Sequence, residues 1–142
     1  MTTFQDGGCH DWIVAKIKWI MLVSGALTCT MLYSAIAPEA SLQASFGENL
    51  EGPLANLIVR NWAVLIGLMG AMLIYGAFDP PSRKLVLAVA GTSKAVFIAL
   101  VLSHGGRYLS QQVGISVVVD LVMICLFMVY FIGIRNNNRV VA

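Results

Sequence analysis

Residues 85–103 read LVLAVAGTSKAVFIALVLS, a run that indicates the class of fold. Almost every position is apolar or small, and a segment of about 20 such residues crosses a bilayer as an α-helix. Lys94 lies at its centre. A charge in the middle of a membrane is costly, so we treat Lys94 as a candidate functional residue that needs a partner.

The composition of the whole chain agrees with a membrane protein. Of its 142 residues, 58% are hydrophobic and 11% are charged, whereas a soluble domain has about 25% charged residues. We therefore expect one membrane domain, residues 1–142, without a separate soluble domain. The net charge of +2 and the lack of a basic cluster argue against nucleic acid as a partner.

Four apolar runs predict transmembrane segments at about 19–37, 54–78, 85–103 and 112–134. No run alternates apolar and polar residues as a strand does, so we expect an all-α, integral membrane four-helix bundle. Residues 1–11 are predicted to form a flexible tail. The first run resembles a signal peptide, but it is longer than a signal core. We therefore expect it to be a spanning helix that ends at Pro38.

The basic residues predict the orientation. The N-terminal flank, the second loop and the C-terminal flank contain six of them, Lys16, Lys18, Arg83, Lys84, Arg135 and Arg139. The first and third loops contain only Arg107. By the positive-inside rule, both termini are expected in the cytoplasm.

Depth counting relates three charged residues in or near the spans. At about 1.5 Å per residue, Lys94 lies about 15 Å, Asp120 about 22 Å and Arg60 about 27 Å above the inner boundary. A lysine side chain extends toward the interface. We therefore expect the three charged groups to meet in the outer half of the membrane.

Polar neighbours extend this predicted site. Gln112, Ser116 and Asp120 follow one another at intervals of four, and Asn56 precedes Arg60 by four. These faces predict an outward-facing polar pocket above an apolar inner half. The first loop has three acidic residues, Glu39, Glu48 and Glu51, of which Glu48 or Glu51 would close over the pocket.

Two interpretations of these charges are open. In the structural one, Lys94 and Asp120 only fix the register of two helices, and Arg60 anchors its helix at the outer headgroups. In the functional one, the excess positive charge binds a carboxylate, a phosphate headgroup or a quinone ring.

Two further patterns concern packing. Leu42 and Phe46 are four residues apart, so a short helical turn would lay both on the membrane surface. Gly67 and Ala71 form a pair of small residues at the same interval, which indicates either close packing within the bundle or dimerisation.

The sequence offers no signature of an enzyme. It has no CxxC pair, no nucleophile elbow and no phosphate-binding glycine loop, and Cys9 beside His10 does not make a metal site. We expect no catalytic residues, no metal and no resident cofactor, with a quinone or a bound lipid as the ligands to consider.

Several single residues resemble those of the DoxX-related four-helix bacterial membrane proteins. The similar elements are Pro38-Glu39, Phe46-Gly47, Arg60, the 67–70 segment, Asp79-Pro80 and Lys94. The resemblance implies a four-helix bundle in the bacterial inner membrane. Some proteins of that group are linked to quinone or thiol redox systems.

The functional hypotheses follow from these features. The first is a non-enzymatic accessory or interaction subunit with a polar site for an anionic or lipid headgroup. The second is a small transporter or channel lined by the intramembrane charges, and the third is a quinone-linked redox subunit. Membrane lipid is the expected partner, together with a larger membrane complex or a homo-oligomer.

Overall fold

The computed structural model describes residues 7–48, 51–104 and 106–140, and each element in these ranges is helical. The long helices are α1 (Gly7–Cys29), α4 (Pro53–Phe78), α5 (Pro80–Ser103) and α6 (Gln112–Val140). The short ones are η1 (Thr30–Leu32), α2 (Tyr33–Ile36) and α3 (Pro38–Phe46). Four helices are long and apolar enough to cross a membrane. The predicted all-α bundle is confirmed.

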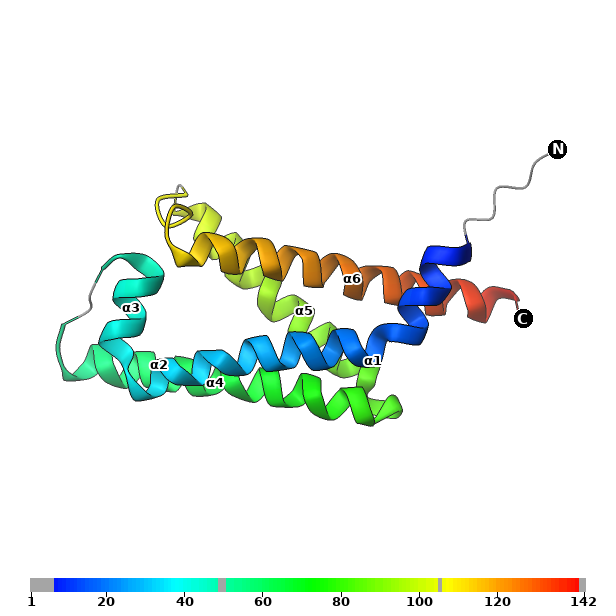
Figure 1. Cartoon of the computed structure of the whole chain (residues 1–142), viewed down its shortest axis with the longest axis horizontal. Coiled ribbons are helices and arrows are strands. Elements are labelled where there is room, and N and C mark those ends of the chain that lie inside the picture. Colours follow the sequence, from blue (N-terminus) through cyan, green and yellow to red (C-terminus); the bar gives the residue numbers. More distant parts are fainter. Residues whose placement is uncertain (1–6, 49–50, 105, 141–142) are drawn as a thin grey trace.

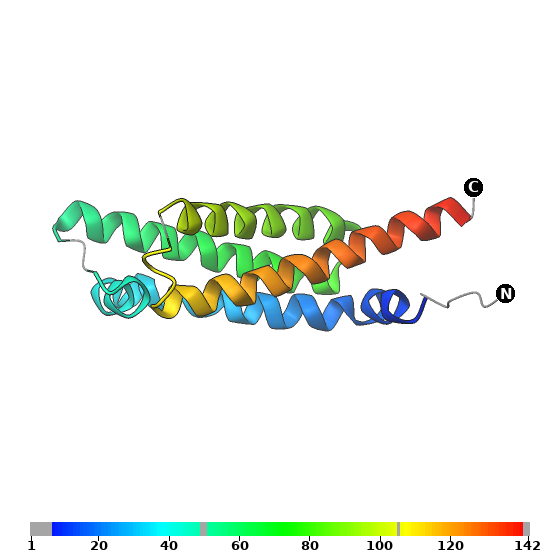
Figure 2. The same ribbon diagram turned by 90° about the horizontal axis from the view of Figure 1, so that it is seen from above.

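The four long helices form a ring in which each packs against two neighbours (Figures 1 and 2). Helix α1 packs against α4 and α6, and α5 packs against the same two helices. Within the described residues, α4 and α6 therefore lie diagonally and do not pack on each other. Helix α1 begins and α6 ends at one end of the bundle, here called the termini end. The opposite end, with α3, is called the loop end.

The first crossing consists of three segments that follow one another, α1, η1 and α2. The Thr28 hydroxyl donates to the Ser24 carbonyl oxygen at 2.7 Å, and the Thr30 hydroxyl donates to that of Leu27 at 2.6 Å. Such bonds to the preceding turn bend helices. They accompany the tighter 3-10 turn at Thr30–Leu32.

Local sequence signals set the ends of the other helices. Pro38 and Pro53 occupy first-turn positions, and Gly47 ends α3 with a φ of 71° in the left-handed region. Asp79 caps α5 by accepting a hydrogen bond from the Ser82 amide at 3.3 Å. Arg83 donates to the carbonyl oxygens of the last turn of α4, which fixes the α4–α5 turn.

Helix α3 crosses the loop end from α2 to α6 (Figure 1). The predicted helical turn is confirmed, but the predicted position of its apolar side chains is wrong. Leu42 is buried, and the Phe46 ring contacts the rings of Trp62 and Tyr108. Both side chains face the bundle because α3 packs against α4 and α6, which removes them from the membrane surface.

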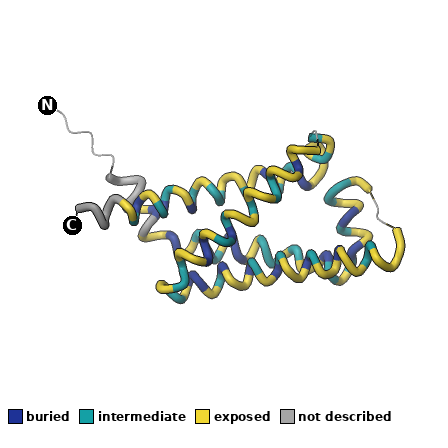
Figure 3. The backbone as a smooth tube through the Cα atoms, turned by 180° about the vertical axis from the view of Figure 1, so that it is seen from behind, coloured by how far each residue is buried: buried dark blue, intermediate teal, exposed yellow. Residues whose placement is uncertain are grey.

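Two clusters of buried side chains hold the bundle together. The larger lies in the half nearer the termini end and consists of Ile13, Ile17, Met21, Leu73, Ala77, Val86, Leu87, Ala90, Phe127 and Tyr130. The smaller joins α5 to α6 near the loop end and consists of Val101, Val113 and Val117. Figure 3 shows buried positions along α1 and α4 alternating with exposed ones. The half of the bundle nearer the termini end, which the sequence predicts to be apolar, is thus a packed core.

The predicted boundaries need three corrections. Residues 7–11 are helical, so the predicted flexible tail at 1–11 is wrong for these five residues, and residues 1–6 lie outside the described residues. Helix α5 begins at Pro80 because Asp79 caps it, which places Arg83 and Lys84 inside the helix. Helix α6 continues beyond residue 134 to Val140, since no glycine or proline stops it there.

Candidate functional site

Lys94 and Asp120 form an ion pair between α5 and α6, as depth counting predicts. Lys94 lies one turn beyond the buried Ala90, and Asp120 lies two turns from the buried Phe127. Both side chains therefore project onto the inward faces of their helices, above the larger cluster. They are 12% and 17% exposed. Most of the surface of both side chains is thus covered by the bundle.

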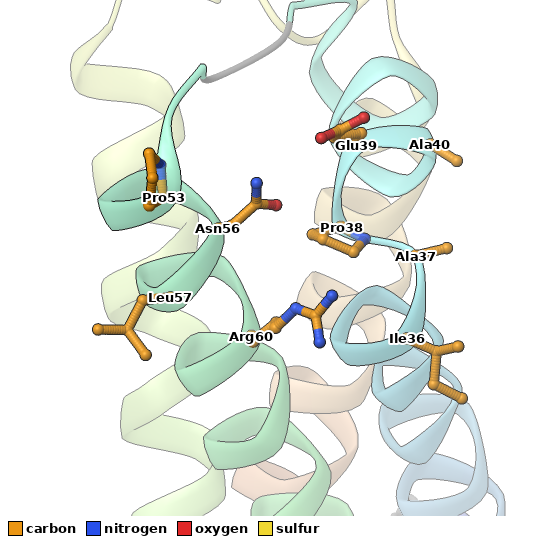
Figure 4. Close-up of a pocket in the computed structure, with 9 residues that line it drawn as sticks. All are labelled: Ile36, Ala37, Pro38, Glu39, Ala40, Pro53, Asn56, Leu57 and Arg60. Carbon is orange, nitrogen blue, oxygen red and sulfur yellow. The ribbon is translucent and has the colours of Figure 1, made fainter.

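Arg60 lies elsewhere, in a pocket at the loop end (Figure 4). The pocket has a volume of about 650 Å³ and lies between α4 and the junction of α2 with α3. Its lining residues are Ile36, Ala37, Pro38, Glu39, Ala40, Pro53, Asn56, Leu57 and Arg60. Arg60 and Asn56 project from α4 toward the junction, and Glu39 projects back from α3.

The predicted trio of Arg60, Lys94 and Asp120 is therefore divided into two places. Depth counting gave the height of each residue correctly enough to find the Lys94–Asp120 pair. Depth counting gave no information on the rotation of each helix about its own axis, which decides which neighbours a side chain faces. Arg60 faces α2 and α3, whereas Asp120 lies on α6, which does not pack on α4.

The other predicted site residues are divided in the same way. Asn56 lines the Arg60 pocket. Ser116 and Gln112 lie on α6 on the loop side of Asp120, and the Ser116 hydroxyl donates to the Gln112 carbonyl oxygen at 3.5 Å. Gln112 is exposed. The polar stripe of α6 therefore leads to the ion pair and not to Arg60.

The acidic residue of the pocket is Glu39, which the sequence did not single out for this place. Glu48, one of the two expected there, forms an exposed ion pair with Arg107 and accepts a hydrogen bond from Tyr108. The signal for Glu39 was its position directly after Pro38, since a proline in the first turn places the next residue near the helix start. The packing of α3 against α2 and α4 then places Glu39 in the pocket that Arg60 also lines.

The charges of the pocket are separated. Among the described residues, no carboxylate lies within 4.0 Å of the Arg60 guanidinium, although Glu39 lines the same pocket. Arginine presents several N–H donors in a planar fork that matches carboxylate and phosphate oxygens. Within the part of the chain that the structure describes, the pocket thus offers a ligand a guanidinium without a carboxylate partner, an amide and a carboxylate.

The chain has four helices long and apolar enough to span a bilayer, which fits a multi-pass membrane protein. No protein-family model, curated protein or solved structure matches the chain. The resemblance to the DoxX-related proteins therefore stays a prediction.

Proposed function

We propose that this chain is a non-enzymatic accessory protein of the bacterial inner membrane that binds the phosphate headgroup of a membrane lipid in its outward-facing Arg60 pocket. One observation carries the proposal: the Arg60 guanidinium projects into an open pocket at the loop end with no carboxylate partner among the described residues. The orientation rests on the distribution of basic residues.

The depth of Arg60 suits a lipid phosphate. Helix α4 has 26 residues and is therefore about 39 Å long, against a hydrocarbon core of about 30 Å. Arg60 lies about 10 Å from the start of α4, close to the outer boundary of that core. Its side chain reaches headgroup phosphates from this position.

The surface beside the pocket suits acyl chains. Ile36 and Leu57 line its edges, and their side chains point away from the pocket (Figure 4). They are 79% and 65% exposed. In a bilayer such side chains contact hydrocarbon, so a lipid held by its phosphate at Arg60 would lay its chains beside them.

Lys94 and Asp120 serve the bundle in this proposal. Their charges cancel, and their place between α5 and α6 suits an ion pair that fixes the register of two helices. The packed larger cluster lies between this pair and the termini end. A continuous polar path for a transporter or channel therefore has no support from the described residues.

Replacing Arg60 with glutamine is expected to weaken phospholipid binding about tenfold, because a charge-assisted hydrogen bond to phosphate is lost. Native mass spectrometry of the purified full-length protein, titrated with a phospholipid of defined acyl chains, measures the fraction bound. Arg107→Gln is the matched control, since Arg107 lies at the same end outside the pocket. Equal weakening by both substitutions would refute a specific site at Arg60.

The proposed orientation has a separate test. In a background with the three native cysteines changed to serine, Ala44→Cys places a thiol on exposed α3 and Pro81→Cys places one in the first turn of α5. An impermeant thiol reagent is expected to label residue 44 in intact cells and residue 81 only after lysis. The reverse pattern would show that the loop end faces the cytoplasm.

A further inference from the structure

The Arg60 pocket holds charges of both signs on opposite walls. Arg60 and Asn56 project from α4, and Glu39 projects toward them from α3 (Figure 4). The two charged groups do not form an ion pair with each other. A pocket that keeps a cation and an anion apart leaves each of them free for an opposite charge on a ligand.

A purely anionic ligand uses only half of this arrangement. Its phosphate would pair with Arg60, but any second negative charge would meet the Glu39 carboxylate, and like charges repel. A ligand with a phosphate and a nearby cation satisfies both walls. The Asn56 amide lies on the Arg60 wall and offers N–H donors to the phosphate oxygens.

The lining residues also distinguish the kind of cation. Sites for quaternary ammonium groups are built from aromatic rings, and the pocket is lined by no aromatic residue among those described. A primary ammonium has three N–H donors that a carboxylate accepts, whereas a quaternary ammonium has none. Glu39 thus favours a primary ammonium.

We propose that the ligand of the Arg60 pocket is a zwitterionic aminophospholipid, with its phosphate at Arg60 and Asn56 and its primary ammonium at Glu39. This inference rests on the proposed phosphate site and adds the identity of the headgroup. Phosphatidylethanolamine is the membrane lipid with this chemistry. Its two-carbon link keeps the phosphate and the ammonium within a few ångströms, which suits two walls of one pocket.

The test compares three lipids with identical acyl chains. The full-length protein is titrated with phosphatidylethanolamine, phosphatidylcholine and phosphatidylglycerol, and binding is measured by native mass spectrometry. We expect phosphatidylethanolamine to bind at least about threefold more tightly than either of the other lipids. Its primary ammonium donates a charge-assisted hydrogen bond to Glu39 that the other two headgroups lack. Equal binding of the three lipids would overturn the assignment of the headgroup.

Two substitutions separate this inference from the phosphate site. Glu39→Gln is expected to abolish the preference for phosphatidylethanolamine while leaving phosphatidylglycerol binding equal or stronger. Arg60→Gln is expected to weaken all three lipids. If Arg60→Gln weakens all lipids but Glu39→Gln keeps the preference, the phosphate site stands and the ammonium site is refuted. Glu51→Gln, an exposed carboxylate outside the pocket, is the control and should change nothing.

A last arm separates a lipid from a soluble molecule with the same headgroup. Free phosphoethanolamine is added as a competitor for the lipid. Circular dichroism separately verifies that each variant keeps its helical fold. We expect competition only at concentrations far above those of the lipid, because the acyl chains contribute binding energy. Competition at concentrations equal to the lipid's would overturn the assignment to a membrane lipid.

Discussion

Replacing Lys94 with methionine is expected to lower the free energy of unfolding by about 3–5 kcal/mol, the usual cost of leaving one member of a buried ion pair alone. Asp120 would remain on the inward face of α6, where its side chain is 17% exposed, without its partner on α5. Reversible unfolding of the full-length protein in mixed micelles, followed by circular dichroism, measures the change.

The double variant Lys94→Met/Asp120→Leu tests whether the loss of stability comes from leaving the Asp120 carboxylate without its partner. Because both charges are removed, most of the lost stability is expected to return, to within about 1 kcal/mol of the original. Lys84→Met, an exposed cation on the same helix, is the control and should change stability by at most about 0.5 kcal/mol.

The same variants test the division of roles between the two charged places. We expect Lys94→Met to retain the relative affinities for phospholipids in the fraction that folds. A Lys94→Met protein that keeps its stability but no longer binds lipid would contradict the register role and would return Lys94 to the ligand site.

Replacing Gly70 with alanine is expected to destabilise the bundle by about 3 kcal/mol, the upper range for overpacking a well-packed core. A Cβ at Gly70 would lie 2.6 Å from Cys29 Sγ, 2.8 Å from the Gly25 carbonyl oxygen and 2.9 Å from the Cys29 amide nitrogen. Two of these atoms belong to the backbone of α1, so the helices themselves must separate. Unfolding in mixed micelles measures the loss.

Gly91→Ala on α5 is the matched control for this substitution. A Cβ there would lie 3.8 Å from Phe127 Cδ2, an ordinary van der Waals contact. Alanine also has the higher helix propensity, worth up to about 1 kcal/mol. We therefore expect Gly91→Ala to be neutral or stabilising. Equal destabilisation by both substitutions would contradict a specific close approach of α1 and α4.

The small residues on α4 show what a sequence pattern can and cannot predict about helix packing. The sequence left open whether the Gly67 surface packs within the bundle or between copies. In the structure Gly67 packs against Leu32, and Gly70 packs against Gly25 and Cys29. Packing within the bundle is thus confirmed for these two glycines, whereas Ala71, the other member of the pair, is exposed.

The fold class, the approximate positions of the four spans and the pairing of Lys94 with Asp120 could all be predicted from the amino-acid sequence. Segment length and composition suffice for the spans, because a chain in hydrocarbon must pair its backbone groups internally and therefore forms helices. Depth along a helix follows from residue number alone. Because α5 and α6 are neighbours, similar depth was sufficient to match Lys94 to Asp120.

The helix faces that pack against each other could not be predicted in this way. Lipid and protein interior are both apolar, so hydrophobic periodicity does not indicate the inward side of a spanning helix. Arg60 therefore turned out to face α2 and α3, and Glu39, not Glu48 or Glu51, lines its pocket. The crossing of α3 over the loop end depends on contacts with α4 and α6 that lie far away in sequence. Contacts between distant segments thus placed the candidate binding site, while the local sequence placed the helices that form it.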